Sequence, residues 1–178
     1  MKIWLIRHGR TQLNQQGLIQ GWIDAPLNHD GRLQAECVAN TCRELDIDAI
    51  FSSDLIRARQ TAQAIAKVIC VPVMYTWLLR ERSYGELEMR SKHDVCWTEI
   101  DGGGPEYDLL GVETRQKLKQ RLIAFLHSLS SFPRPLRRIV VITHAGVMNE
   151  FCHLVDPHHR WRRFHNTAIH ELTYLENY

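Results

Sequence analysis

The feature that most constrains the fold is a short apolar run near the start of the chain that ends abruptly in charge. Residues 3–6 are wholly apolar, and Arg7, His8 and Gly9 follow at once. A run this short, without polar alternation, is typical of a strand buried on both faces of a parallel sheet. Open α/β sheets bind ligands at the carboxyl ends of such strands, and Gly9 allows the backbone to turn there. By itself, Arg-His-Gly also fits a capping or surface histidine.

A second apolar run shows the same pattern late in the chain. Residues 139–142 are apolar, and Thr143 and His144 follow them. If the two strands are neighbours in a parallel sheet, His8 and His144 lie side by side at its carboxyl edge. The guanidinium of Arg7 disfavours a protonated imidazole, so His8 should be neutral, as a nucleophile or a metal ligand must be.

Arginine near a helix start is the third signal. Residues 48–53 predict a strand, and Asp54 is expected to cap a helix over about 55–68 that carries Arg57 and Arg59 near its start. Cations there oppose the helix dipole. Either they are solvated or paired with Asp54, or an anion binds at the helix end together with arginine.

These neighbours decide between a metal site and an anion site. Metal sites need further His or carboxylate ligands, whereas Arg7 and Arg57 would repel a cation. We therefore expect an anion site, with no metal and no cofactor.

The remaining pattern predicts a three-layer α/β/α fold with a mostly parallel central sheet and an edge strand, in one domain over residues 1–178. The segment 83–112 is the hardest to interpret and is expected to be an insertion that covers the site, with a hinge or turn at its Gly-Gly-Gly-Pro run. The other expected elements are a loop over 12–30, a helix over 31–45, a strand within 71–79, a helix over 113–130, a helix from about 147 and an edge strand over 168–174.

Bulk properties exclude several classes of protein. The formal net charge of +2 is too small to indicate a nucleic-acid partner, and no apolar run is long enough to cross a membrane. The beginning of the chain does not resemble a signal peptide. The five cysteines are odd in number and contain no Cys-x-x-Cys pair, so we expect reduced thiols in the cytoplasm. The oligomeric state stays open.

Taken together, the motifs resemble those of the histidine phosphatase superfamily, the phosphoglycerate-mutase-like fold. The matches occur in order and span nearly the whole chain: L-I-R-H-G-x-T-x-x-N at 5–14, Q-G-x-x-D-x-P-L-x-x-x-G at 20–31, S-S-D-L-x-R-A-x-Q-T-A at 52–62, E-R-x-Y-G-x-L-E at 81–88, G-x-E-T at 111–114 and T-H-A-G at 143–146.

The resemblance implies a role for each matching position. His8 would be the nucleophile that becomes phosphorylated, and Glu81 would protonate the leaving alcohol and then activate water. Arg7, Arg57 and His144 would hold the phosphoryl oxygens. The further substrate-binding positions it implies are Asn14, Gln20, Gly21, Arg10, Arg82 and Ala145.

Some positions depart from the family pattern. Arg10 stands where many members have an acidic residue, Ala145 where glycine is common, and Met89 where glycine is frequent. None of these removes a catalytic group. A difficulty remains at Glu81, because the neighbouring Arg80 and Arg82 disfavour the protonated carboxyl that a general acid needs.

The resemblance implies a metal-independent phosphomonoesterase that acts through a phosphohistidine on small phosphorylated metabolites. A phosphoglycerate-type mutase is the first alternative, and a non-catalytic module that binds phosphorylated ligands is the second. Residues 158–165 mix basic and aromatic side chains, as nucleic-acid surfaces do, but one such cluster more often forms a solvated loop or helps to hold an acidic substrate.

Overall fold

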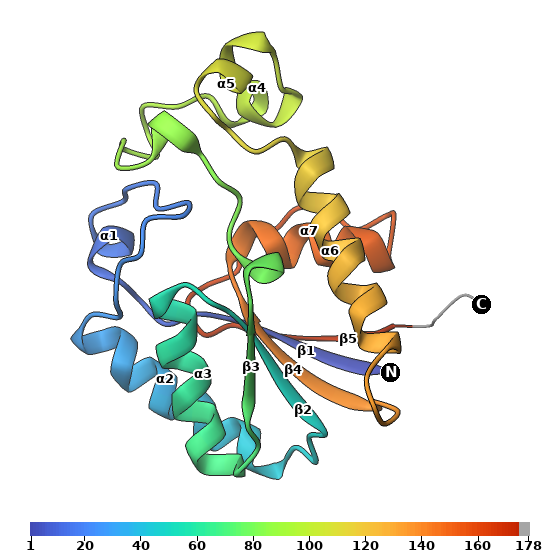
Figure 1. The fold of residues 1–178 in the computed structure, drawn as a ribbon. Helices are drawn as coiled ribbons and strands as arrows, with labels where there is room; N and C mark the ends of the chain where they lie inside the picture. Colours follow the sequence, from blue (N-terminus) through green and yellow to red (C-terminus); the bar gives the residue numbers. More distant parts are fainter. Residues whose placement is uncertain (175–178) are drawn as a thin grey trace.

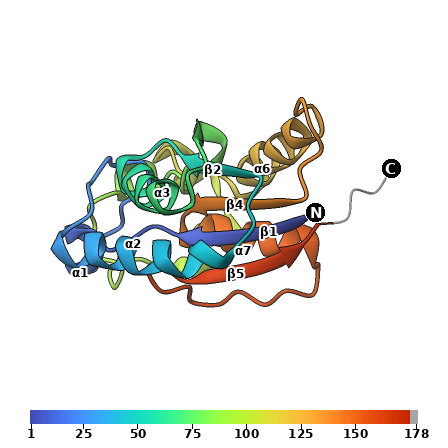
Figure 2. The same ribbon diagram turned by 90° about the horizontal axis from the view of Figure 1, so that it is seen from below.

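The computed structural model describes residues 1–174, so the last four residues of the predicted domain lie outside the described part. At its centre is a five-stranded sheet in the order β3-β2-β4-β1-β5. Four strands are parallel, and β5 pairs antiparallel with β1 at one edge. Helices cover both faces (Figures 1 and 2), which confirms the predicted three-layer fold with an edge strand. The strands are β1 (Lys2–Arg7), β2 (Ala49–Ser53), β3 (Val73–Thr76), β4 (Arg138–Thr143) and β5 (Ile169–Thr173).

The apolar run in β1 is explained by helices on both of its faces. Trp4 and Ile6 pack into a cluster with residues of α2 (His29–Thr41) and α3 (Ile56–Ile69). Successive strand side chains point to opposite faces, so the alternate residues of β1 enter the other layer. Burial of each large aliphatic side chain contributes about 1.5–3 kcal/mol, which makes this strand a major source of stability.

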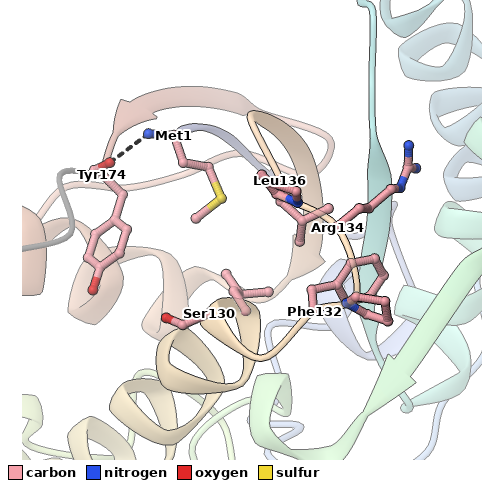
Figure 3. A pocket seen from close by; sticks show the side chains of 9 residues that line it. Met1, Ser130, Phe132, Arg134, Leu136 and Tyr174 are labelled. Atoms are coloured by element: carbon pink, nitrogen blue, oxygen red, sulfur yellow. Dashed lines mark hydrogen bonds between the residues drawn. The ribbon is translucent and has the colours of Figure 1, made fainter.

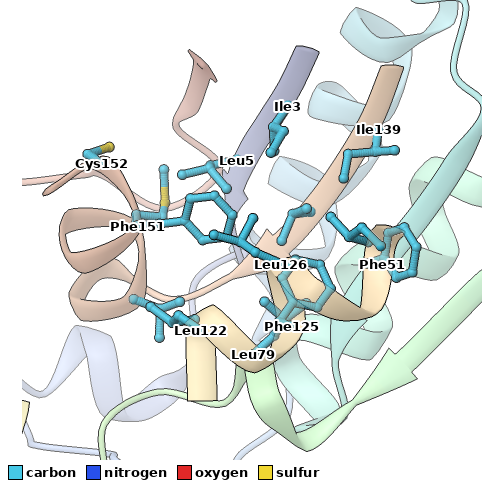
Figure 4. Packing of buried hydrophobic residues seen from close by; sticks show 14 of the residues in the cluster. Ile3, Leu5, Phe51, Leu79, Leu122, Phe125, Leu126, Ile139, Phe151 and Cys152 are labelled. Carbon is cyan, nitrogen blue, oxygen red and sulfur yellow. The ribbon is translucent and has the colours of Figure 1, made fainter. Parts of the chain in front are cut away.

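The opposite face packs against α6 (Arg115–Ser130) and α7 (Ala145–Val155). Figure 4 shows Ile3 and Leu5 of β1 meeting Phe151 of α7, with Phe125 of α6 on the other side of the cluster. The helix predicted from about 147 therefore begins two residues earlier, and the helix predicted over 113–130 begins at Arg115. Of the helices in residues 1–174, none combines the length and apolar character needed to cross a membrane.

Local hydrogen bonds explain why other helix and strand ends differ from the predicted ones. The helix predicted over 31–45 begins at His29, because the Asn28 side chain caps the Gly31 N–H, and it ends in a 3₁₀ turn, η1 (Cys42–Glu44). The strand predicted within 71–79 stops at Thr76, whose hydroxyl accepts a hydrogen bond from Leu78 N–H and starts a second 3₁₀ turn, η2 (Trp77–Leu79).

The prediction that Asp54 caps α3 is wrong. Asp54 instead binds the Arg80 guanidinium through both oxygens, at 2.7 and 2.6 Å. The Ile56 N–H at the helix start donates to the Asp24 carboxylate at 2.6 Å. A bidentate pair with arginine is stronger than a single cap bond, and it leaves the cap to a carboxylate from a distant loop.

The expected loop over 12–30 contains a single helical turn, α1 (Gln12–Gln15). Thr11 and Asn14 form a reciprocal capping box, in which each side chain accepts a hydrogen bond from the other residue's backbone N–H. This turn was missed because its sequence carries no apolar periodicity.

The segment 83–112 forms η3 (Gly85–Leu87), α4 (Trp97–Gly102) and α5 (Pro105–Leu109). Figure 1 shows α4 and α5 together beyond one end of α6, away from the strands. A small core of its own stabilises this segment, formed by Ile19, Leu87, Ile100 and Val112. The predicted turn is present, since α4 ends at Gly102 and Gly104 precedes Pro105 at the start of α5.

The left-handed backbone conformation at the end of α3 can be tested by replacing each of two exposed cysteines with glycine. Cys70 ends α3 in the left-handed region, at φ 57°, where glycine is favoured. Cys70→Gly should raise the free energy of unfolding by about 0.5–1 kcal/mol, because the strain removed exceeds the entropy added to the unfolded chain. Urea denaturation measures the change.

The matched control is Cys37→Gly inside α2, which is also exposed. It should lower the free energy of unfolding by about 0.5 kcal/mol, because glycine is a poor helix former. A loss of stability in Cys70→Gly would contradict the left-handed helix end.

Candidate active site

The two predicted histidines meet at the carboxyl edge of the sheet. In the parallel pairing of β1 and β4, Arg7 lies opposite Thr143, so His8 and His144 follow neighbouring strands at the same level. Their ring centroids are 5.0 Å apart, and both side chains are buried. The sheet register therefore brings together two imidazoles that are 136 positions apart in the sequence.

The orientation of His8 leaves one ring nitrogen available for chemistry. Its Nδ1 lies 2.7 Å from the carbonyl oxygen of Gly9, which can only accept a hydrogen bond. The proton of the neutral ring is therefore on Nδ1, and Nε2 keeps its lone pair. The loop around it is tight, because a Cβ at Gly9 would lie 2.4 Å from the carbonyl oxygen of Gly31.

His144 presents the opposite arrangement. Its Nε2 lies 2.9 Å from Ser53 Oγ, which also accepts a hydrogen bond from the Leu55 N–H. The Ser53 hydroxyl can therefore donate to Nε2, and we infer the tautomer with the ring proton on Nδ1. That Nδ1 is buried and has no hydrogen-bond partner within residues 1–174. The result is a donor without an acceptor next to a histidine with a free lone pair.

Two buried arginines complete the surroundings of His8. Arg57 donates to the carbonyl oxygens of Ile23 and Gly21 at 2.7 and 2.8 Å, and Arg7 donates to the carbonyl oxygen of Phe164 at 2.7 Å. In the part of the chain that the structure describes, neither has a carboxylate partner, and the Nε of each is buried without a hydrogen-bond partner.

Burial and these charges keep the histidines neutral. Burial, followed by the Arg57 and Arg7 guanidinium groups, lowers the pKa of His8 well below its usual value. Burial and then Arg57 lower the pKa of His144 in the same way. Burial also lowers the pKa of Arg57 to about 10, so this guanidinium is still positive at neutral pH.

The side chain of Glu81 places its carboxylate at the start of α7. Its Oε2 accepts a hydrogen bond from Gly146 N–H at 3.2 Å, and its Oε1 accepts one from Arg82 N–H at 3.0 Å. A Cβ at Gly146 would lie 2.6 Å from Glu81 Oε1, so a larger residue there would displace the carboxylate.

Two of the cations near Glu81 are bound to other carboxylates. Arg80 pairs with Asp54, and Arg82 pairs with Asp101 at 2.5 Å. Each of these two guanidinium groups is therefore largely neutralised by another carboxylate. Arg7 and Arg57 are not paired in this way within residues 1–174. Burial lowers the pKa of both, and the negative charge of Glu81 acts to raise it.

Asn14 is held with its amide in one orientation. Its Oδ1 accepts hydrogen bonds from Thr11 N–H and from the amide of Asn166, both at 3.2 Å. Asn166 also donates to the carbonyl oxygen of His8 at 3.0 Å. The donor side of the Asn14 amide is the one left to face a ligand.

The other predicted binding residues divide into two groups. Gly21 contributes its carbonyl oxygen to Arg57, and Ala145 is the first residue of α7, directly after His144. Gln20 accepts a hydrogen bond from the Thr11 hydroxyl at 2.9 Å. The structure does not bring the remaining two side chains to His8.

Arg10 and Arg82 are those two side chains. Arg10 is at the surface, 3.4 Å from the Asp30 carboxylate. Arg82 is buried, and besides Asp101 its guanidinium donates to the carbonyl oxygens of Glu113 and Ile100. The Arg82 side chain thus fastens the insertion to the segment just before α6.

Sequence reasoning missed several residues that support the site. Ser53 holds His144, and Thr61 accepts a hydrogen bond from Gly9 N–H at 3.0 Å. Both belong to the motif at 52–62, which was the available signal. Nothing in the sequence marked Asn166 or Lys92, whereas Arg163 belongs to the basic-aromatic segment 158–165. The positive charges of Lys92 and Arg163 nevertheless act on Arg7 or His8.

This arrangement suits an oxyanion rather than a metal ion. The three residues around His8, which are Arg7, Arg57 and His144, each have a buried nitrogen atom without a hydrogen-bond partner in the described residues, and two of these nitrogens belong to cations. Among the described residues, no three His, Cys, Asp or Glu side chains are grouped so that they could hold a metal ion.

A cavity of about 320 Å³ lies at the end of the sheet that is opposite to the histidine site. Figure 3 shows Met1, Phe132 and Leu136 around it, with the amino group of Met1 donating to the carbonyl oxygen of Tyr174 at 2.8 Å. None of the residues that form the histidine site lines it, so we assign it no part in the chemistry.

Comparison with known proteins points in the same direction as the geometry. Residues 3–178 match the family model described as "Histidine phosphatase superfamily (branch 1)". A relative in Schizosaccharomyces pombe, named as a probable phosphatase, is 36% identical and is aligned over 84% of this chain and 70% of its own length. A relative in Escherichia coli, named as a probable phosphoglycerate mutase, is 32% identical over 99% of this chain and 86% of its own length.

Solved structures show the same fold. A mycobacterial glucosyl-3-phosphoglycerate phosphatase in complex with VO3 superposes with a TM-score of 0.81 at 24% identity, over 97% of this chain and 92% of that chain. The alpha-ribazole phosphatase of Shigella flexneri superposes with a TM-score of 0.75 at 28% identity, over 87% of this chain and 79% of that chain.

The buried neutral histidines predict that acid destabilises the protein. Below pH about 6.5 the unfolded chain protonates both imidazoles while the folded protein does not, so the unfolded state binds more protons and the free energy of unfolding decreases as the pH is lowered. Each buried neutral imidazole accounts for a decrease of about 1.4 kcal/mol per pH unit. We expect the free energy of unfolding in urea to fall by about 2–3 kcal/mol between pH 7.5 and 5.5.

Variants assign this effect to the site. His8→Gln and His144→Gln should each remove about half of the pH-dependent loss, and the double variant should remove nearly all of it. An equally steep loss in the double variant would show that other groups cause it.

Proposed function

Because the chain belongs to the histidine phosphatase superfamily and is an enzyme of that family, we propose that it is a metal-independent phosphomonoesterase that acts through a phosphohistidine on small phosphorylated metabolites. One observation carries this proposal. His8 Nε2 keeps its lone pair, the His144 ring lies 5.0 Å away, and the Arg57 and Arg7 guanidinium groups are close enough that, after burial, they lower the pKa of His8, while Nε of each arginine and Nδ1 of His144 are buried without partners in residues 1–174. A phosphoryl group attacked by His8 would supply the acceptors that these donors lack.

In the first step, His8 Nε2 attacks phosphorus as the ester P–O bond breaks in line. Phosphoryl transfer depends mostly on positioning and on stabilisation of charge on the equatorial oxygens. Arg7, Arg57 and His144 provide three donors for those oxygens, two of them cationic. The departing alcohol oxygen takes a proton from Glu81, and the phosphoryl group is left on His8.

In the second step, water attacks phosphorus from the side that the alcohol left. Glu81, now ionised, takes a proton from the water as the P–N bond to His8 breaks. Inorganic phosphate leaves, and both His8 and Glu81 return to their starting forms. The residues contribute positioning, charge and proton transfer, and no step requires a metal ion.

The protonated form of Glu81 is the demanding requirement. Two N–H donors favour its carboxylate, while the pairs Arg80–Asp54 and Arg82–Asp101 reduce the opposing positive charge. A dianionic phosphate bound between Arg7 and Arg57 would offset the positive charge of both. The mechanism requires that Glu81 carry the proton that the leaving oxygen takes.

A phosphoglycerate-type mutase is the alternative, and the relative named as a probable phosphoglycerate mutase is the observation that keeps it in view. Both reactions share the phosphohistidine and differ in whether water or an alcohol accepts the phosphoryl group. Hydrolysis is favoured because the segment 83–112, which contains α4 and α5, is short. The product, inorganic phosphate or an isomeric ester, distinguishes the two reactions.

We place the protein in the cytoplasm in this proposal. All five cysteines are free thiols in the structure, and reduced thiols are typical of that compartment.

The assignment of Glu81 as the acid predicts a dependence on the leaving group. With EDTA present, the protein should release inorganic phosphate from both p-nitrophenyl phosphate and glycerol 2-phosphate. In kcat/KM, which reports phosphoryl transfer to His8 and not the later attack of water, Glu81→Gln should slow glycerol 2-phosphate by about 10²- to 10⁴-fold, because an alkoxide needs a proton to leave. It should lower kcat/KM for p-nitrophenyl phosphate far less.

Two further variants complete the comparison. Arg57→Lys should slow both esters alike, because an ammonium group cannot reproduce the forked contact with two oxygens. Glu86→Gln, at an exposed glutamate five positions from Glu81, should change neither rate. Equal losses of kcat/KM on both esters in Glu81→Gln would mean that another group is the acid. If neither ester is hydrolysed by the unaltered protein, the proposed function is wrong.

A further inference from the structure

A cavity of about 440 Å³ lies beside Glu81 and is not explained by the chemistry at phosphorus. It is enclosed by the insertion, by the starts of α6 and α7 and by the basic-aromatic segment 158–165. The lining residues that matter here are Tyr84, Trp97, Arg115, Gly146, Trp161 and Arg163.

The position of this cavity matches that of a leaving alcohol. In an in-line displacement the alcohol departs opposite His8, on the side of the group that protonates it. Gly146 lines the cavity, and its N–H donates to Glu81 at 3.2 Å. An alcohol oxygen within reach of Glu81 therefore has the rest of its molecule next to this cavity.

Aromatic side chains give the cavity flat walls. Trp97 meets Tyr84 edge to face, with ring centroids 5.6 Å apart. The Arg115 guanidinium lies 4.8 Å from the centre of the Trp161 ring, and a contact with Glu150 at 3.1 Å fixes Arg115 in turn. Trp161 is nevertheless 44% exposed, so much of its ring can still contact a ligand. Rigid aromatic surfaces of this kind bind rings.

The charge of the cavity is positive, and one of its cations is unpaired. Arg115 and Arg82 have carboxylate partners, and Arg162 contacts His170 at 2.6 Å. Arg163 is exposed and has no ion pair within residues 1–174. Its charge reaches the site, since Arg163 is one of the groups that lower the pKa of Arg7, after burial. A free cation at the rim of an aromatic cavity suits a ligand with a ring and an acidic group.

We propose that this cavity binds the alcohol part of the substrate and selects phosphomonoesters whose alcohol contains a ring and a second anionic group. Trp97 and Trp161 would contact the ring, and Arg163 would pair with the anion. The volume fits a ring-sized group, because cavities of about 300–1,000 Å³ hold drug-sized ligands. This inference rests on the proposed function and adds the substrate class to it.

The test compares esters that differ in one feature at a time, with kcat/KM measured in EDTA. The unaltered protein should prefer 3-carboxyphenyl phosphate to phenyl phosphate by at least about threefold. Arg163→Gln should abolish that preference, measured as the ratio of the two kcat/KM values in the same protein. Arg160→Gln makes the same change three positions away, at an exposed arginine that does not line the cavity, and should leave the preference intact.

The ring is tested separately. Trp161→Leu should lower kcat/KM for cyclohexyl phosphate about fivefold and leave isopropyl phosphate, an ester of a secondary alcohol without a ring, nearly unchanged. Equal losses on the two esters would contradict a ring-binding wall.

The outcomes separate this inference from the function on which it rests. If phenyl phosphate is hydrolysed but the carboxylate brings no preference, or the preference survives Arg163→Gln, the inference is wrong and the phosphatase assignment stands. If no ester is hydrolysed, the phosphatase assignment fails and the inference fails with it.

Discussion

The structure depends on holding a positive charge where water cannot reach it. Arg57 is 1% exposed, and within residues 1–174 two carbonyl oxygens of the loop before α2 are its hydrogen-bond acceptors. A buried ion without a counter-ion costs several kcal/mol, which such carbonyls offset only in part. The same loop carries Asp24, which caps the start of α3 and so fixes the backbone of Arg57. The loop and the helix end therefore form one unit, which an oxyanion at His8 would complete.

Much of the fold could be predicted from local pattern. The runs at 3–6 and 139–142 are apolar on both faces because helices cover both sides of the sheet, and that requirement is written directly in the sequence. The start of α3 could not be predicted in detail. Whether Asp54 caps it depends on where Arg80 and Asp24 lie, and those contacts span 26 and 32 positions. Short elements held by hydrogen bonds, such as α1, also lack a periodic signal.

The candidate site shows the same division. The apolar runs that end just before His8 and His144 predicted that the two histidines would meet. The parallel register of β1 and β4 places them at the same level. The residues that set their protonation, such as Ser53, were visible only as parts of motifs. Asn166 lies outside any motif, and Arg163 lies in the basic-aromatic segment 158–165, whose position in the fold the sequence does not show. They reach the site because the chain after α7 passes beside His8 before β5, which is a fact of topology rather than of local sequence.

The central claim is that His8 carries the phosphoryl group, and a trapped intermediate tests it most directly. Glu81→Gln should still transfer phosphate from p-nitrophenyl phosphate to the protein, but it lacks the base that activates water, so the phosphoenzyme should accumulate. An alkaline quench, which preserves phosphohistidine, followed by peptide mapping by mass spectrometry, should locate the phosphoryl group on His8, with none in Glu81→Gln that also carries His8→Ala. A phosphoryl group on His144, or one that persists without His8, would contradict the account.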